Sequence, residues 1–250
     1  MKKRNIKYGF ILFLISSACL SAQSDRNRFK AGVAIGAAFS QIDGDLQQGY
    51  HRLGYVFGIN GSYFVKPHID VSTELYLNSR GTRPNPRTER FGKDELQTTL
   101  LLHYAEARLV SNWHVAPNVE KGYFRQSIHV GLLYGRLLSS KVLVNRGDKK
   151  DDITAEPIKS ALKNSDLGVT LGWSWRFSSQ VSATILHAVS LVPIYRNAKV
   201  ATDKQDFERF VPYHFSLQVR YDFISPKRQI DNKKKKAKLK AKDNPLEQIE

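Results

Sequence analysis

The sequence predicts an all-β fold, an eight-stranded antiparallel up-and-down transmembrane β-barrel. Three observations lead to this prediction: apolar and polar residues alternate along eight segments, the connections between these segments are in turn short and long, and aromatic residues gather near the short connections. Alternation with a period of two indicates a β-strand, because successive side chains point to opposite faces. With 250 residues, 41% of them hydrophobic, the chain is long enough for one sizeable domain.

Residues 210–223 show the alternation most clearly. From Tyr213 onward one face carries aromatic and aliphatic side chains and ends in Tyr221 and Phe223, while the other face carries polar side chains from His214 to Asp222. A soluble β-sandwich buries its apolar face, whereas a membrane barrel turns that face to lipid and its polar face to the lumen. This strand alone is compatible with both arrangements, so the rest of the chain must decide.

The other seven alternating segments, in chain order, are residues 29–40, 53–65, 69–80, 97–113, 123–138, 166–177 and 181–191. The first has small residues on one face, such as Gly32 and Gly36, which suits the crowded interior of a small barrel. Connections after the second, fourth and sixth segments are short, whereas the remaining ones are long and charged. Outer-membrane barrels have this asymmetry, with tight periplasmic turns and long external loops. Both mature termini would then be periplasmic.

An aromatic girdle is expected at the periplasmic interface, because Trp, Tyr and Phe accumulate where a barrel crosses the membrane surface. All three tryptophans, counting Trp173, lie toward the short connections. The predicted girdle consists of Phe29, Tyr63, Trp113, Phe124, Trp175, Phe177, Tyr221 and Phe223.

A polar network is predicted inside the barrel, on the faces opposite the apolar ones. Its members are Asp70, Glu74, Glu106, Arg108, Arg125, Arg176, Arg220 and Asp222. Eight strands enclose a lumen only wide enough for side chains, and buried charges must pair, so this network is interpreted as a salt-bridged plug rather than as a catalytic or transport site. A soluble lipocalin-like barrel is the alternative, and it would have to leave these charges outside.

One pair of residues in the sequence is a candidate catalytic site. Some outer-membrane barrels act on lipid A, and a deacylase of this kind would need a His-x-Ser pair on a strand, a spacing that His214 and Ser216 match. Their face is predicted to point to the lumen, away from an acyl chain, and no orienting carboxylate is evident. The seven histidines are scattered without metal-ligand spacing, so the sequence predicts neither an enzyme, nor a metal site, nor a cofactor.

Basic residues in the predicted external loops could contact lipopolysaccharide phosphates or a partner, or could simply be solvated. They are Arg80, Arg83, Arg87, Arg90, Arg146, Lys149 and Lys150. Outer-membrane lipid and lipopolysaccharide are therefore the expected partners. The formal net charge of +16 does not indicate nucleic-acid binding, because an exported chain rarely meets nucleic acid.

The two ends of the chain have their own composition. Residues 1–22 are predicted to be a signal peptide, with basic residues before an apolar run at 10–20 and cleavage near Ala22. The single cysteine, Cys19, lies within it, and its lipidation is an alternative. The barrel is assigned to residues 23–224. Residues 225–250 carry nine basic and four acidic residues and are predicted to be a disordered periplasmic tail that could recruit a periplasmic or secretion-system protein.

Several stretches resemble a known family, the PorT-like outer-membrane β-barrel proteins of the Bacteroidetes. The resemblance runs from about residue 29 to 223, in FKAGVAIGAAFSQIDGD, IDVSTELYLNSRG, HVGLLYGRLLSSK, DLGVTLGWSWRF and FSLQVRYDF. It implies the barrel fold and an outer-membrane location. Named members are similar to components of gliding and type IX secretion, but this chain resembles the generic branch more. The resulting expectation is a non-enzymatic barrel with a structural, adhesive or secretion-accessory role.

Overall fold

The computed structural model describes residues 28–45, 49–85, 96–118, 121–146, 149–150, 152–196 and 209–225. The expected signal peptide and the basic tail beyond Ser225 lie outside these residues. Among the described residues, no helix has the length and apolarity needed to cross a bilayer.

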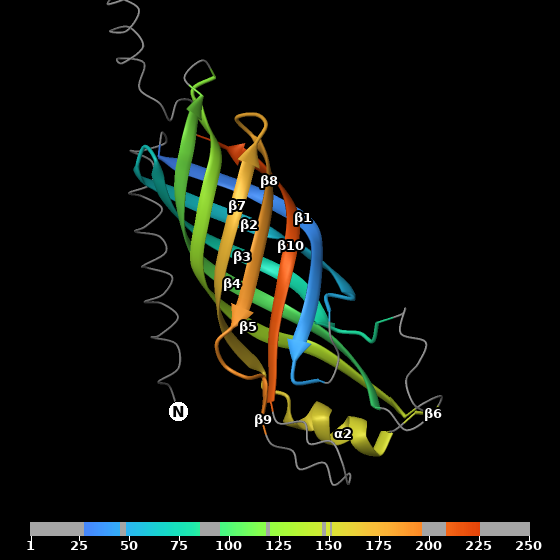
Figure 1. Ribbon diagram of the computed structural model, residues 1–250. Coiled ribbons are helices and arrows are strands. Elements are labelled where there is room, and N and C mark those ends of the chain that lie inside the picture. The colour runs from blue at the N-terminus through green and yellow to red at the C-terminus, as the bar shows by residue number, and fades with distance from the viewer. Residues whose placement is uncertain are drawn as a thin grey trace, which may run out of the picture.

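Eight long strands form a closed antiparallel ring (Figure 1). They are β1 (Phe29–Asp43), β2 (Arg52–Lys66), β3 (Ile69–Thr82), β4 (Leu96–Asn118), β5 (Tyr123–Arg146), β7 (Ser165–Arg176), β8 (Val181–Ser190) and β10 (Arg209–Ile224). Each pairs with the next, and β1 pairs with β10 to close the ring, with Val33 opposite Tyr221 and Phe39 opposite Phe215. The predicted eight-stranded up-and-down barrel is confirmed.

The closing seam depends on small residues. Gly36 lies beside the β10 backbone, where an added Cβ would stand only 2.0 Å from the carbonyl oxygen of Leu217. A larger side chain would force β1 and β10 apart. The small-residue face that the sequence shows in this segment therefore allows two strands from opposite ends of the barrel segment to pair.

Connections between strands alternate in length around the ring. The connections after β2, β4 and β7 are short and lie at one end of the ring, whereas those after β1, β3, β5 and β8 span more residues and lie at the other end. The predicted asymmetry is thus present, and β1 begins and β10 ends at the short-turn end (Figure 1).

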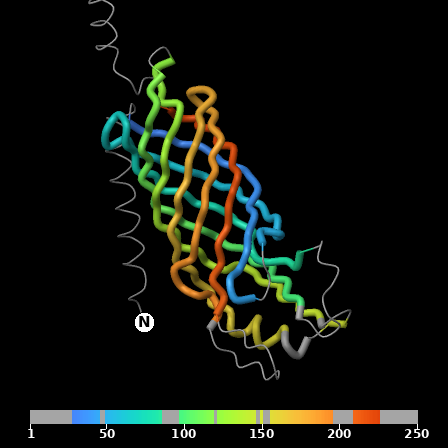
Figure 2. The backbone as a smooth tube through the Cα atoms, viewed as in Figure 1, coloured from blue at the N-terminus to red at the C-terminus, as the bar shows by residue number. Residues whose placement is uncertain are grey.

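The long-loop end contains more regular structure than the sequence pattern predicts. Residues 139–165 were expected to be a loop, but β5 continues to Arg146, and β6 (Lys149–Lys150) and the helix α2 (Asp152–Ala161) follow. A two-residue strand, β9 (Tyr195–Arg196), pairs with β10. Figure 2 shows β4 and β5 continuing past the rest of the ring at this end. Alternation persists here, since Val142 and Val144 are buried between exposed or half-buried neighbours.

An apolar core fills the barrel at the long-loop end. It combines the helix α2 and the residues around it with the inner faces of the projecting strands. Its buried members are Ile42, Leu100, Leu102, Tyr104, Val142, Val144, Ala155, Ile158, Leu162, Ile194, Tyr195 and Phe210. The rings of Tyr195 and Phe210 stack with centroids 4.6 Å apart. This α2 core closes one end of the barrel.

Candidate functional site

Inner and outer faces of the barrel wall have opposite character. Apolar side chains point outward and remain exposed, with exposed fractions of 68% for Ile35, 60% for Leu171 and 50% for Leu217. Polar and charged side chains point inward and are buried. A wall of this kind is stable only where the outer face meets lipid. The soluble lipocalin-like alternative is therefore wrong, because it requires the reverse orientation.

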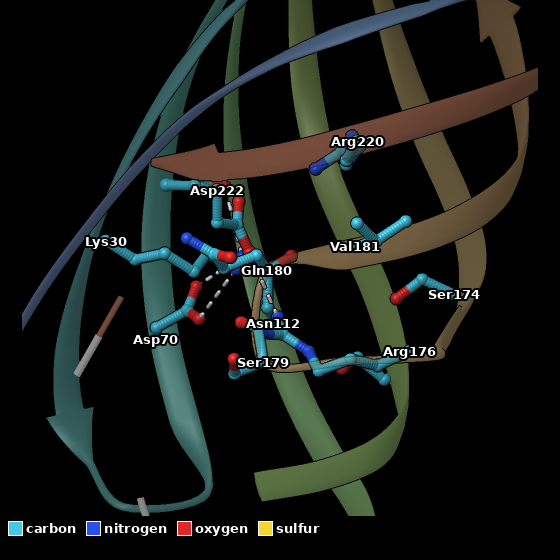
Figure 3. Close-up of polar contacts among 12 residues, drawn as sticks. Lys30, Asp70, Asn112, Ser174, Arg176, Ser179, Gln180, Val181, Arg220 and Asp222 are labelled. Carbon is cyan, nitrogen blue, oxygen red and sulfur yellow. Dashed lines mark hydrogen bonds and ion pairs between the residues drawn. The ribbon is translucent and has the colours of Figure 1, made fainter. Parts of the chain in front are cut away.

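Asp70 on β3 organises the charges nearest the short-turn end (Figure 3). Its carboxylate lies 3.9 Å from the Lys30 ammonium and 2.7 Å from His114 Nε2, and it accepts a hydrogen bond from the Asn112 amide. Asp222 on β10 lies 3.9 Å from the same Lys30 and 3.4 Å from Arg176. Lys30 thus bridges two carboxylates that lie on β3 and β10, far apart in the sequence.

Histidines extend this cluster around the wall. The His114 Nδ1 atom lies 2.6 Å from Ser127 Oγ, and His129 lies between Asn112 Oδ1 at 2.5 Å and Ser174 Oγ at 2.8 Å. Each ring nitrogen therefore has a polar neighbour. These side-chain contacts link the four strands β3, β4, β5 and β7. They offset the free-energy cost of burying the polar side chains.

Two ion pairs occupy the middle of the lumen. Arg220 donates to Glu74 Oε1 at 2.7 Å, across β10 and β3. Arg108 pairs with Glu106 at 2.5 Å, and its guanidinium lies 4.6 Å from the centroid of the Tyr76 ring. The cation–π contact supplies a second favourable interaction for the buried Arg108 guanidinium.

A third group lies nearer the long-loop end. Arg80 binds Asp166 at 2.5 Å, lies 3.8 Å from Glu106 and stands over the Tyr104 ring at 4.0 Å. Ser190 donates to the same Asp166 carboxylate at 2.8 Å. Because Tyr104 also belongs to the α2 core, the charged lumen passes directly into the apolar closure.

Charges of the described barrel strands balance inside the ring. Five buried cationic side chains face five buried carboxylates, namely Lys30, Arg80, Arg108, Arg176 and Arg220 against Asp70, Glu74, Glu106, Asp166 and Asp222. A sixth buried carboxylate, Asp45, follows β1 at the long-loop end. Each cation lies within 4.0 Å of at least one carboxylate. This arrangement is a paired plug that fills the space enclosed by eight strands.

Two predicted positions are wrong. Arg125 was expected in the lumen but is exposed, since it lies beside an irregular stretch of the β4–β5 ladder where Ala116 has a φ of 54°. Arg80 was expected in an external loop but is buried, because β3 continues to Thr82 and keeps Arg80 inside the ring. Arg83, Lys149 and Lys150 are exposed, while Arg87, Arg90 and the Arg146 side chain lie outside the described part of the molecule.

Sequence reasoning missed several members of the network. Lys30, His129 and Asp166 all lie on faces that alternation places inside, yet they were not grouped with the other charges. The inward register of each strand is the signal in the sequence that could have identified these three residues. His114 was harder to assign, because it stands near the end of β4, beside the irregular ladder.

Most of the predicted girdle lies on the outer face near the short-turn end, where Tyr63, Trp113, Trp175, Phe177, Tyr221 and Phe223 are exposed. Phe29 is half-buried, and its ring lies 5.3 Å from that of Tyr63. The prediction that Phe124 belongs to the girdle is wrong. Its half-buried ring stacks on the buried His114 ring, with centroids 5.8 Å apart, and does not stand free on the outer wall.

A second aromatic group, which strand alternation does not predict, lies on the opposite rim. Tyr50, from the connection between β1 and β2, packs against Tyr213 and Phe215 with ring centroids 5.5 and 5.1 Å apart. His187 lies 4.2 Å from Phe215. The contact brings a loop residue onto the outer wall, so alternation within strands could not reveal it.

His214 and Ser216 do not form an accessible catalytic pair. Both side chains are fully buried in the lumen. Ser216 accepts a hydrogen bond from the Gln218 amide at 2.8 Å, and His214 Nε2 lies 3.1 Å from Asn78 Nδ2. The neighbour of the histidine is thus an amide rather than an orienting carboxylate. Within the described residues, no group of three or more His, Cys, Asp or Glu side chains is placed to hold a metal ion.

Comparison with known proteins agrees with this geometry. Residues 21–192 match the family described as outer membrane protein beta-barrel domain. No curated protein sequence matches the chain.

Three solved barrels resemble the fold. Neisserial surface protein A is 12% identical and has a TM-score of 0.40, over 79% of this chain and 97% of that one. Ail of Yersinia pestis is 11% identical, with a TM-score of 0.36 over 78% and 99%. CarO of Acinetobacter baumannii is 7% identical, with a TM-score of 0.40 over 76% and 97%. The family match covers more than half of the chain, and the protein belongs to the outer membrane β-barrel domain family.

Proposed function

We propose that the protein is a non-enzymatic outer-membrane barrel that acts through its surfaces, as a structural or adhesive element, and not through its lumen. The observation that carries this proposal is the filled interior. Paired charges occupy the lumen from Asp70 to Asp166, and the α2 core closes the long-loop end. His214 and Ser216 are fully buried within this filled interior, which favours neither a substrate site there nor a solute path along the axis.

The long-loop end offers a basic surface. Lys141, Lys149, Lys150, Lys159 and Lys163 are exposed there, and Glu156 is an exposed carboxylate that pairs with Lys159 at 3.6 Å. Clustered ammonium groups attract phosphate and carboxylate groups over several ångströms. We therefore assign to this end, taken as external, contact with anionic groups of the cell surface such as lipopolysaccharide phosphates.

A secretion-accessory role of the PorT type is the more specific form of this proposal. It would place the short-turn end and both mature termini in the periplasm, with the basic residues after Ser225 available to a periplasmic partner. A pull-down with the full chain and with a chain truncated after Ser225 tests this role. Loss of a specific captured protein on truncation is expected, and an identical set of captured proteins would contradict it.

Membrane fractionation tests the general proposal. The protein should be recovered from outer membranes and should migrate differently on a gel before and after boiling, as folded barrels do. In planar bilayers the purified protein should give no stable ion conductance. A steady conductance would show an open lumen, and recovery of the chain in the soluble fraction would overturn the location.

The basic end is tested by charge reversal. Lys149→Glu combined with Lys150→Glu should reduce binding to lipopolysaccharide, most clearly at low salt, because both side chains are exposed and act by long-range attraction. The matched control is Lys66→Glu, an exposed lysine at the short-turn end. Equal binding by all three proteins would rule out a role of this surface.

A further inference from the structure

The outer wall of the barrel is not smooth. A groove of about 690 Å³ crosses β1 to β5 and is lined mostly by outward-facing apolar residues, together with Arg136 and the buried wall residues Ala34, Tyr76 and Glu106. Two rows of cross-strand neighbours form it. One row is Val33, Ile59, Leu75, Ala107 and Tyr134, and the other is Phe57, Leu77, Ala105 and Arg136.

Side-chain size explains the groove. Ala105 and Ala107 project little from β4, whereas Leu75 and Leu77 on β3 and Tyr134 on β5 stand on both sides of them. The longer row crosses four inter-strand spacings of about 4.8 Å, or roughly 19 Å in all. This is the scale of an extended fatty acyl chain, and the groove opens directly to the lipid.

Arg136 is the only charged residue in these two rows, and its side chain is exposed. Its outward neighbours are Tyr134 and Leu138 along β5 and Ala105 on β4, none of them charged. In the described part of the chain, no carboxylate pairs with it. A cation in an apolar wall is costly unless an anion or the headgroup layer meets it, so its placement indicates a ligand group.

Arg136 lies at the rim of the wall. It stands opposite Ser165, where β7 begins after a long connection, whereas Val33 lies near the start of β1 at the short-turn end. The groove therefore rises from the short-turn side toward the long-loop side, and its cationic end is nearer the long loops. If that side is external, as in the proposed function, Arg136 reaches the headgroups of the outer leaflet.

A second groove on the opposite wall provides a contrast. It measures about 440 Å³ and is lined by Leu171, Gly172, Trp173, Trp175, Ala183, Ile185, His187 and Phe215. It contains no Arg, Lys, Asp or Glu. Any lipid chain can fill it, but nothing in it selects a charged headgroup.

We propose that the larger groove binds one acyl chain of lipid A, with a phosphate of that lipid at the Arg136 guanidinium. The assignment rests on the orientation in the proposed function. Guanidinium groups bind phosphate through paired charge-assisted hydrogen bonds, which accounts for a single arginine at the end of an apolar channel.

Native mass spectrometry of the purified protein in mild detergent tests this site, with lipid A, dephosphorylated lipid A and phosphatidylethanolamine as added probes. Arg136→Gln should weaken lipid A binding about tenfold or more, the loss expected for a charge-assisted hydrogen bond, and should leave the dephosphorylated probe unaffected. Ala107→Leu should fill the groove and weaken binding of both forms.

Matched controls are Arg125→Gln, an exposed arginine near the short-turn end, and Ala183→Leu, which fills the smaller groove. Both should bind lipid A like the unmodified protein. Lipid A binding that is unchanged in Arg136→Gln and in Ala107→Leu would overturn the site. So would phosphatidylethanolamine binding as strong as that of lipid A and reduced to the same extent by the two substitutions. Heat-modifiability confirms that each variant is folded. Failure of the proposed function would appear separately, as absence of the chain from outer membranes.

Discussion

At the short-turn end the interior of the barrel is filled by ion pairs around Asp70, whereas at the long-loop end it is filled by an apolar core around Ile158. The difference follows from where each end lies. Strands that cross the bilayer need their apolar faces for lipid, so polar side chains remain for the inside. Where β4 and β5 extend past the other strands, their inner faces can instead bury apolar side chains against α2, which is favourable because it removes them from water.

The two closures should respond differently to mutation. An ion pair fails abruptly when one partner is lost, because an unpaired charge stays buried. An apolar core loses stability in proportion to the methylene groups removed. The predictions below use this contrast, from the largest expected effect to the smallest.

Glu74→Gln should destabilise the barrel most. It leaves Arg220 buried without its 2.7 Å partner, and breaking such a pair costs about 3–5 kcal/mol. Urea unfolding in detergent or lipid measures the change in the free energy of unfolding. Thr73→Val, an exposed outward neighbour on the same strand, is the control and should have little effect. Equal stability of the two variants would show that the pair is not structural.

Ile158→Ala should loosen the α2 core and leave the barrel folded. Truncation of a fully buried isoleucine costs about 2–5 kcal/mol, and here the loss is confined to the long-loop end. Limited proteolysis should cut near α2 sooner, while heat-modifiability is retained. Lys159→Ala, next to it and exposed, should be cut at the original rate. A simultaneous loss of the barrel would mean that the two closures are one cooperative unit.

Asp222→Asn should weaken the short-turn cluster by a smaller amount, about 1–3 kcal/mol. Its contacts with Lys30 and Arg176 are long, at 3.9 and 3.4 Å, and Lys30 keeps Asp70 as a partner. The same unfolding measurement applies, with Tyr221→Phe on the outer face as the control. A loss as large as that of Glu74→Gln would show that Asp222 is the main partner of the cluster.

Arg125→Ala should change the free energy of unfolding by less than about 0.5 kcal/mol, because its side chain is exposed at the end of the barrel. Arg176→Ala, a buried arginine near the same end, should be clearly destabilising in a parallel measurement. If the two variants lost equal stability, Arg125 would belong to the lumen after all.

Alternation made the fold and most of the lumen predictable. Asp70, Glu74, Glu106, Arg108, Arg176, Arg220 and Asp222 are all buried inside the ring, as the inward register implies. Register failed at Arg125, which lies beside an irregular stretch of the β4–β5 ladder. Arg80 has the inward register of the segment 69–80, and only its assignment to an external loop was wrong, because β3 continues to Thr82.

Pairing within the lumen could not be read from the chain. Lys30 and Asp222, or Arg220 and Glu74, come together only because β1 and β10 close the ring, and a strand pattern contains no partner information. The sequence pattern did not predict the helix α2 for a related reason. Its apolar residues form a core only by packing with residues of the projecting strands, such as Leu100 and Val142.

The sequence by itself determined the number of strands, their alternating faces and the division into a short-turn end and a long-loop end. These are local properties, since side-chain direction along a strand has a period of two and loop length is a property of the chain. Only the tertiary structure decided which charges pair, how α2 closes the barrel and where Ala105, Ala107 and Arg136 form a groove. Each of these depends on neighbours that strand pairing brings together from distant segments.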